Sequence, residues 1–316
     1  MKDSLVIGSR GSKLALRQAD WVKERIALFH PNLTVSVQII KTSGDILKDS
    51  PLVAIGGKGV FTKELEDALR DGRIDLAVHS LKDLPTTMPA GLTISTITDR
   101  EDPRDALVVR PGLELNHGSI SDLPTGCAVG TSSPRRSAQL KHLRPDLIIK
   151  DLRGNVDTRL GKLTSGEYDA AILAAAGLRR LGMADRISAT IDITEMVPAV
   201  GQGALAIETR ADELETSGIL AKLDNAETRA ACTAERAFLR TLGGGCELPI
   251  AAHGVVTGQS LVLYGLVADP SGERIERNSI EGHVNDAARL GESLAEQLLA
   301  SGASAILAMS HRNTST

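Results

Sequence analysis

A short apolar run that ends in glycine, followed by small hydroxyl residues and a helical pattern, occurs twice in this 316-residue chain. The first copy is residues 5–7 running into Gly8, and the second is residues 127–129 running into Gly130. In the second copy Ser133 suits a helix N-cap and is followed by a proline, which is accepted at the first helical position. Further apolar runs alternate with helical spacing after both copies, which predicts two α/β units with mostly parallel sheets.

The stretches Gly8–Ser12 and Gly130–Ser133 hold equivalent places, where strands end and helices begin. In α/β sheets this edge is where ligands bind, and it presents helix N-termini to them. From about Leu223 the pattern changes to helix, adjacent strands and helix, which indicates a small α+β domain. We therefore expect two doubly wound α/β domains, of the kind seen in periplasmic binding proteins, that face a cleft, and a small C-terminal α+β domain.

Domain boundaries follow from these changes of pattern and from Pro198–Gly203, which is typical of a crossing segment. We expect a first α/β domain that covers residues 1–103 with 198–221. A second α/β domain covers residues 104–197, and a C-terminal domain covers residues 222–316. The glycine-rich stretch 42–59 is long for a structureless connection. We interpret it as a mobile lid, with domain shifts about hinges near 99–105 and Pro198.

The overall charge excludes several classes of partner. The net charge is −4, and aromatic residues make up 2%, which disfavours a nucleic-acid surface or a membrane belt.

No apolar run approaches a membrane span, and the apolar stretch near the N-terminus is too short for a signal peptide. The three cysteines, Cys127, Cys232 and Cys246, are too few for a disulfide framework and have no metal-ligand spacing. We expect a cytoplasmic protein without a metal.

Basic residues concentrate in one segment. Residues 135–162 contain eight Lys or Arg and three Asp, a net charge of +5 in a chain whose total is −4. Several of these arginines fall at strand-to-helix turns, and guanidinium forks bind carboxylates and phosphates. The segment is either a site for a polyanionic small molecule or a solvated basic face.

Two further residues stand at positions suited to chemistry. Asp83 follows a buried-type strand at its carboxyl end, where a carboxylate could steady a developing cation or move a proton. The alternative is a turn aspartate ahead of Pro85. Cys246 follows three glycines and precedes Pro249. A thiol on such a loop is either a nucleophile or attachment point, or incidental to a glycine-rich helix stop.

Six blocks of the chain, in the same order, are similar to motifs of one known family. They are Gly8–Leu16, Gly56–Phe61, His79–Pro85, Gly130–Arg136, Leu152–Leu160 and Gly244–Pro249. On these blocks the whole chain resembles the porphobilinogen deaminase (hydroxymethylbilane synthase) family. Pro134, where an aliphatic residue is frequent, and Gly243, which makes a triple glycine, are small departures.

The resemblance implies a transferase of porphyrin and haem biosynthesis. Its substrate would be porphobilinogen, four molecules of which are deaminated and joined head to tail into hydroxymethylbilane and ammonia. It also implies a covalent dipyrromethane cofactor, made from substrate and attached through a thioether to Cys246. Asp83 matches the catalytic aspartate. A monomer is the default expectation, and product hand-off to uroporphyrinogen III synthase is compatible with this reading.

The same resemblance implies further binding residues. Those that match cofactor-binding positions are Lys82, Thr131, Ser133, Arg135, Arg136 and Arg159. Those that match substrate-binding positions are Arg10, Ser12, Arg153, Arg159 and Arg180. Each pyrrole carries two carboxylates, so a concentrated set of arginines suits a growing anionic chain.

Two other functions fit parts of the sequence. A non-catalytic, two-domain solute-binding module would share the architecture, because fold does not fix function. Such a binder gains nothing from a thiol on a glycine loop in a third domain, so Cys246 discriminates against it. An RNA-binding protein could use the basic segment, but the acidic total charge and scarce aromatics disfavour it.

Overall fold

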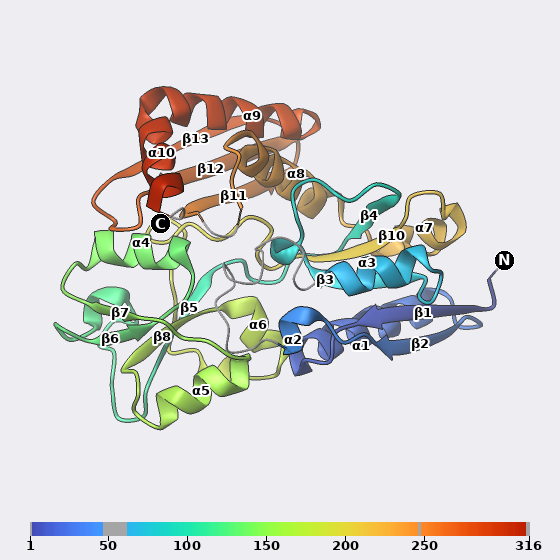
Figure 1. Ribbon diagram of the computed structural model, residues 1–316, viewed down its shortest axis with the longest axis horizontal. Helices are drawn as coiled ribbons and strands as arrows, with labels where there is room; N and C mark the ends of the chain where they lie inside the picture. Colours follow the sequence, from blue (N-terminus) through green and yellow to red (C-terminus); the bar gives the residue numbers. More distant parts are fainter. Residues whose placement is uncertain (1, 47–61, 246–247, 314–316) are drawn as a thin grey trace. The chain divides into compact units, whose positions relative to one another are not determined.

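A computed structural model describes residues 2–46, 62–245 and 248–313. The chain divides into two compact units (Figure 1): Met1–Glu101 with Ala204–Arg229, and Asp102–Gly203 with Ala230–Thr316. The backbone therefore passes from one unit to the other three times. Among the described residues, no helix is long and apolar enough to cross a membrane.

The first unit is built on a five-stranded sheet with the order β2-β1-β3-β10-β4. Strand β1 pairs in parallel with β2 and β3, whereas β10 runs antiparallel to both β3 and β4. The strands are β1 (Ser4–Ser9), β2 (Thr34–Ile39), β3 (Leu76–Ser80), β4 (Leu92–Ile97) and β10 (Leu205–Arg210). The helices of this unit are α1 (Lys13–Phe29), α2 (Ser43–Ile46), α3 (Lys63–Arg70) and α7 (Leu214–Leu220).

Helices cover both faces of this sheet, as the alternation of apolar residues along β1 requires. Leu5 and Ile7 pack with Val22 of α1 in one core cluster. Val6 points to the opposite face and packs against the cluster that holds Leu65 of α3. Successive side chains of a strand point to opposite faces, so a strand buried on both sides reads as a continuous apolar run.

The second unit begins with a sheet of the same plan, ordered β7-β6-β8-β5-β9. Strand β6 pairs in parallel with β7 and β8, and β5 is antiparallel to β8 and β9. The strands are β5 (Asp105–Val109), β6 (Ala128–Gly130), β7 (Ile148–Lys150), β8 (Ala170–Ala174) and β9 (Ala189–Thr190). The helices are α4 (Pro134–Leu143), α5 (Val156–Thr164) and α6 (Ala175–Arg180).

Both faces of this second sheet are also covered. Ile172 of β8 packs in a cluster with Leu140 of α4, and its neighbour Leu173 packs in another with Leu160 of α5. The two sheets confirm the predicted pair of equivalent α/β units. They differ from the expectation of mostly parallel sheets in one respect, because the strand after the three parallel ones is antiparallel in each.

The C-terminal part of the second unit is a three-stranded antiparallel sheet with helices (Figure 1). Its elements are α8 (Ala226–Thr241, from Ala230 on), β11 (Ile250–Thr257), β12 (Ser260–Ala268), β13 (Ile275–His283), α9 (Ala287–Leu298) and α10 (Ser304–Asn313). Phe238 of α8, Leu263 of β12 and Leu294 of α9 share one core cluster. This arrangement confirms the predicted C-terminal α+β domain.

Within the second unit, helix α4 packs against the turn between β12 and β13. Lys141 Nζ donates to the Pro270 carbonyl at 2.9 Å, and His142 Nδ1 lies 3.0 Å from the Gly272 carbonyl oxygen. Gly272 has a φ of +77°, and a Cβ there would lie 2.5 Å from the Ala138 carbonyl oxygen. Only glycine fits this close approach of backbone to backbone.

Candidate functional site

Asp83 lies on a short turn at the carboxyl end of β3. The turn Leu81–Asp83 begins where the Leu81 N–H donates to the Ala204 carbonyl at 3.0 Å. Leu81 and Leu84 are buried on either side, whereas Asp83 is exposed. The two buried leucines anchor the turn, so the carboxylate between them is presented to solvent. Lys82, beside it, is half-buried.

Arg10 and Ser12 follow β1, the strand next to β3. Because β1 and β3 are parallel, with Gly8 opposite Ala77, their carboxyl ends meet at one edge of the sheet. Ser12 is the N-cap of α1, and its hydroxyl accepts from the Ala15 N–H at 3.2 Å. The first unit therefore brings Arg10 and Ser12 to the edge that carries Asp83.

In the second unit, the loop Thr131–Ser133 connects β6 to α4. The Ser133 N–H donates to Thr131 Oγ1 at 3.2 Å, and Ser132 Oγ accepts from the Leu152 N–H at 3.0 Å. Gly130 ends β6, and a Cβ there would lie 2.8 Å from Leu152 Cδ2. Close packing under the loop thus requires glycine at this position.

A cavity of about 210 Å³ opens beside this loop. Thr131 and Ser133 line it, together with Ser137 and Lys141 of α4, Lys150 at the end of β7 and one carboxylate, that of Asp151. The motif comparison missed both lysines. The signal for Lys141 was its helical spacing from Pro134 and Ser137, and the signal for Lys150 was its place at a strand's carboxyl end. Hydroxyls, ammonium groups and a helix N-terminus together favour an anionic group.

Arg135 and Arg136 do not line this cavity. Both are buried, and both bind the carboxylate of Asp105, which is wholly buried. Arg135 donates to Asp105 at 2.7 and 3.2 Å, and Arg136 donates at 2.7 and 3.0 Å. The Gln202 amide adds a donor at 2.9 Å. Sequence reasoning missed both Asp105 and Gln202, because nothing in the local pattern links them to the arginines.

Electrostatics keeps this cluster charged. Burial alone would raise the pKa of Asp105, but the charges and hydrogen bonds of Arg135 and Arg136 outweigh it and hold that pKa well below its usual range. Burial lowers the pKa of Arg136, against the opposing attraction of Asp105. Two guanidinium groups on one carboxylate leave a net charge of +1. Among the described residues, the buried Nε of Arg135 has no hydrogen-bond acceptor.

The remaining arginines lie on later elements of the second unit. Arg153 follows β7 and lies 3.4 Å from Asp151. Arg159, on α5, donates from Nε to the Gly154 carbonyl at 2.8 Å, and Arg180, at the end of α6, donates to the Gly203 carbonyl at 2.5 Å. Because β6 and β7 are parallel, Arg153 and the Thr131–Ser133 loop share one sheet edge.

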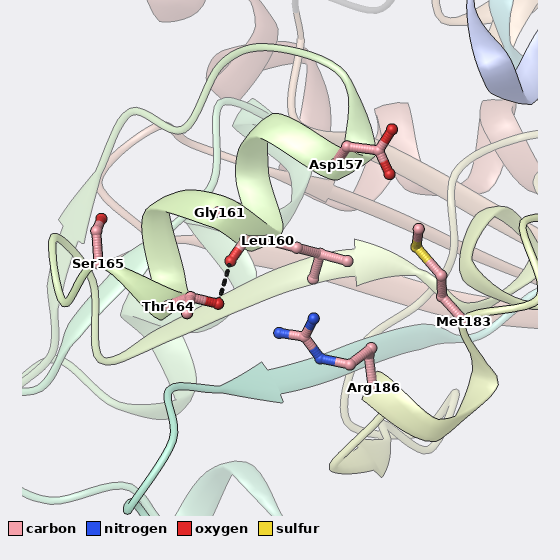
Figure 2. A pocket seen from close by; sticks show the side chains of 7 residues that line it. All are labelled: Asp157, Leu160, Gly161, Thr164, Ser165, Met183 and Arg186. Atoms are coloured by element: carbon pink, nitrogen blue, oxygen red, sulfur yellow. Dashed lines mark hydrogen bonds between the residues drawn. The ribbon is translucent and has the colours of Figure 1, made fainter.

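A second cavity, of about 510 Å³, lies between α5 and the segment after α6. Figure 2 shows Leu160 and Thr164 of the helix on one side and Met183 and Arg186 on the other. None of the site residues predicted from the sequence lines it. In the described ranges, no group of three or more His, Cys, Asp or Glu could hold a metal ion.

Two predictions fall on parts of the chain that are not described. Cys246 lies outside the described residues, immediately after Gly245. Most of the predicted lid, residues 47–59 of 42–59, also lies outside them. The cysteine's role and the lid therefore stay predictions.

Basic and hydroxyl groups at the carboxyl edges of two α/β sheets are typical of proteins that bind small anionic molecules. Comparison with known proteins narrows this class. Residues 5–218 match the family model "Porphobilinogen deaminase, dipyromethane cofactor binding domain", and residues 229–300 match "Porphobilinogen deaminase, C-terminal domain". The chain therefore belongs to the porphobilinogen deaminase family.

Curated relatives match this chain along nearly its whole length. The porphobilinogen deaminase of Roseiflexus castenholzii is 51% identical over 308 residues, which are 98% of this chain and 100% of the relative. That of Syntrophotalea carbinolica is 49% identical, covering 96% and 95%. Among solved structures, the effector-binding domain of BenM with benzoate matches 70% of this chain and 90% of its own, with 18% identity and a TM-score of 0.42. A periplasmic domain of Bordetella pertussis BvgS matches 70% and 86%, with 15% identity and a TM-score of 0.41.

The matched model identifies the cofactor as dipyrromethane. The donors in the second unit fit its acetate and propionate groups. The cavity beside Thr131 and Ser133 offers hydroxyls and two lysines, Lys141 and Lys150, against one carboxylate, Asp151. The Arg135–Arg136–Asp105 cluster keeps a net positive charge, and the Arg135 Nε is a buried donor that lacks an acceptor within the described part of the chain.

Proposed function

We propose that this chain catalyses the stepwise deamination of four porphobilinogen molecules and their head-to-tail condensation into hydroxymethylbilane and ammonia. This is a transferase reaction of tetrapyrrole biosynthesis. The observation that carries the proposal is the match to both porphobilinogen deaminase models, which together span almost the whole chain.

Dipyrromethane is the cofactor, joined to the Cys246 sulfur by a thioether. When bound, it would supply the pyrrole carbon to which the first porphobilinogen unit is joined. Lys82, Thr131, Ser133, Arg135, Arg136 and Arg159 are the residues that hold its carboxylates. The hydroxyls of Thr131 and Ser133 line the cavity at the N-terminus of α4, which supports direct binding there. Arg135 and Arg136 act through the residual charge of their cluster, because Asp105 already occupies most of their donors.

Asp83 is the catalytic carboxylate. As the carbon–nitrogen bond of porphobilinogen breaks, its electron pair leaves with the nitrogen, and the pyrrole becomes electron-poor. A fixed carboxylate next to the pyrrole N–H stabilises that positive charge in the transition state. The carbon–carbon bond then forms, and the proton released from the acceptor carbon is taken up by a base. The exposure of Asp83 on a turn with buried anchors supports this role.

Arg10, Ser12, Arg153, Arg159 and Arg180 bind the carboxylates of substrate and growing product. Arg10 and Ser12 share a sheet edge with Asp83, which supports a role in placing the substrate near it. Arg159 and Arg180 donate to backbone carbonyls in the described structure. These contacts hold the side chains in defined directions, which reduces the entropy lost when they bind a ligand.

The location and assembly state are part of the proposal. The cysteine content suits a reducing compartment, so we propose a cytoplasmic location. For the assembly state we propose a monomer as the default. Hand-off of its product to uroporphyrinogen III synthase is compatible with this. The three-domain division at residues 1–103 with 198–221, 104–197 and 222–316 stays a prediction.

Intact-protein mass spectrometry tests the proposed function. The wild-type chain is compared with Cys246→Ala and with a matched control, Cys127→Ala, which removes a buried thiol just before β6. We expect added mass equal to two pyrrole units in the wild type and in the control, and none in Cys246→Ala. The loaded protein should consume porphobilinogen and release ammonia.

A wild-type chain that carries no added mass, and gains none after incubation with porphobilinogen, would contradict the proposal. A non-catalytic binder of small anions would then be the better description. Equal added mass in Cys246→Ala and in the wild type would move the attachment to another residue.

A further inference from the structure

The first unit contains a buried histidine–glutamate pair to which the proposed function gives no part. His79 lies on β3 and Glu208 on the neighbouring strand β10, and the side chains are 4% and 0% exposed. His79 Nε2 lies 2.9 Å from Glu208 Oε2. Both groups can carry charge, and both are removed from water.

The hydrogen bond between His79 and Glu208 resists separation of the two side chains. At 2.9 Å, His79 Nε2 and Glu208 Oε2 are hydrogen-bond partners. Among the described residues, the other oxygen of Glu208 is buried without a hydrogen-bond partner. His79 is thus the side chain that compensates the burial of this carboxylate. A buried polar group that loses its hydrogen-bond partner is unfavourable, so separation of the two residues is resisted.

The pair sits immediately before the turn that carries Asp83. His79 is opposite Ala206, and Ser80, the last residue of β3, is opposite Leu205. The next backbone contact is the Leu81 N–H to the Ala204 carbonyl, at 3.0 Å, which starts the turn. The His79–Glu208 link therefore runs diagonally between the strands, from the residue before the last pair on β3 to the residue of β10 that lies opposite Ala77.

The other side of β3 is fastened at the same level. Gln18 of α1 donates from Nε2 to Ser80 Oγ at 3.0 Å. The end of β3 is thus held by β10 through Glu208 and by α1 through Gln18. With both links in place, the turn begins from a strand end whose position is fixed in two directions.

We propose that His79 and Glu208 are positioning residues for the reaction, which fix the carboxyl end of β3 so that Lys82 and Asp83 are presented in one geometry. The proposal rests on the proposed function of Asp83. Displacement of a reacting group by about 1 Å can lower turnover by about a hundredfold. A pair that served the core alone would behave differently, because removal of one partner would lower stability and any loss of activity would follow the thermal midpoint.

Steady-state kinetics on Glu208 variants tests this. Glu208→Met and Glu208→Val each replace the carboxylate by an apolar side chain that suits a buried strand. If one of the two variants fails to fold, the other still provides the test. Glu208→Gln keeps a side chain of the same shape that can form a hydrogen bond to His79. The matched control is Thr209→Val, the next residue on β10, whose buried hydroxyl also lacks a hydrogen-bond partner in the described structure. Thermal midpoint and added cofactor mass are measured for every variant.

We expect kcat to fall about tenfold to a hundredfold in Glu208→Met and Glu208→Val, with KM within about twofold of the wild type. Cofactor mass should be retained. Glu208→Gln should recover most of the loss, and Thr209→Val should match the wild type. Asp83→Asn provides the reference for a loss of kcat with the cofactor in place.

Wild-type kcat in a folded Glu208→Met or Glu208→Val variant would overturn the inference. So would an equal loss in Thr209→Val, or a loss that follows the thermal midpoint alone across all variants. These results are distinct from failure of the proposed function, in which the wild-type chain itself would neither carry the cofactor nor release ammonia.

Discussion

Asp105 is the residue whose replacement should reveal most about the second unit. Its buried carboxylate holds two buried arginines, Arg135 and Arg136, through four hydrogen bonds of 2.7 to 3.2 Å. Asp105→Asn keeps the shape but removes the negative charge, and leaves two like charges close together in the interior. Removing one partner of a buried ion pair costs about 3–5 kcal/mol of unfolding free energy.

That cost can be measured directly. For domains of 150–250 residues, 1 kcal/mol shifts the thermal midpoint by about 2–4 °C, so the expected decrease is roughly 6–20 °C. Urea unfolding followed by circular dichroism gives the free energy itself. The control is Asp286→Asn, which removes the exposed ion pair with Arg289 at 3.2 Å and should cost less than about 1 kcal/mol.

The pH dependence supplies a second check. The pKa of Asp105 is lowered in the folded state, so its contribution is fully present above the unfolded pKa of about 4 and is lost as pH falls toward the folded value. The difference between wild type and Asp105→Asn should be constant from pH 5 to 7 and should shrink by about 1.4 kcal/mol per pH unit below pH 4. A difference under 1 kcal/mol at pH 7, or one that is unchanged at pH 3, would refute the reasoning.

Two further predictions concern packing in the second unit. Gly272→Ala should lower the unfolding free energy, measured by urea titration, by about 1–3 kcal/mol more than Gly258→Ala does. Both glycines have a positive φ, but only at Gly272 does backbone lie within 4 Å of the added Cβ. Equal effects would contradict the proposed close approach to Ala138. Burial, assisted by the nearby charge of Asp169, raises the pKa of the Cys127 thiol to about 11. Iodoacetamide at pH 8 should therefore leave Cys127 unmodified in the native protein and label it in urea, with peptide mapping as the measurement. Labelling of the native protein at the rate of a free thiol would contradict this.

The sequence predicted the repeated α/β plan because its signals are local. A strand, a glycine and an N-cap lie within a few residues of one another, so Gly8 and Gly130 could be compared directly. The antiparallel place of β10 between β3 and β4 could not be predicted in this way, because its partners lie more than 100 residues earlier. Strand β13 is hard to predict from the sequence for another reason. Its residues are mostly half-buried or exposed and polar, so it lacks the apolar alternation of a strand with one buried face.

The candidate site shows the same division between local and distant information. The motif blocks predicted Ser133, Arg135 and Arg136 as a group, and the structure places them in one helical turn at the start of α4. The partner of both arginines, Asp105, comes from β5, and the sequence offers no pattern that pairs them. The presence of arginines at this position therefore indicated anion binding. The net charge that remains after they pair with Asp105 could be found only from the structure.

The three passages of the backbone between the two units also set an order of synthesis. Strand β4 is the edge of its sheet, and its neighbour is β10, which the ribosome delivers about a hundred residues later. All five strands of the other α/β sheet lie in the intervening segment, residues 102–203. The nascent chain can thus complete the later sheet while the earlier one still has an unpaired edge at β3. Exposed strand edges are prone to wrong pairing, so the sheet begun by the first hundred residues stays vulnerable until β10 has been synthesised and inserted between β3 and β4.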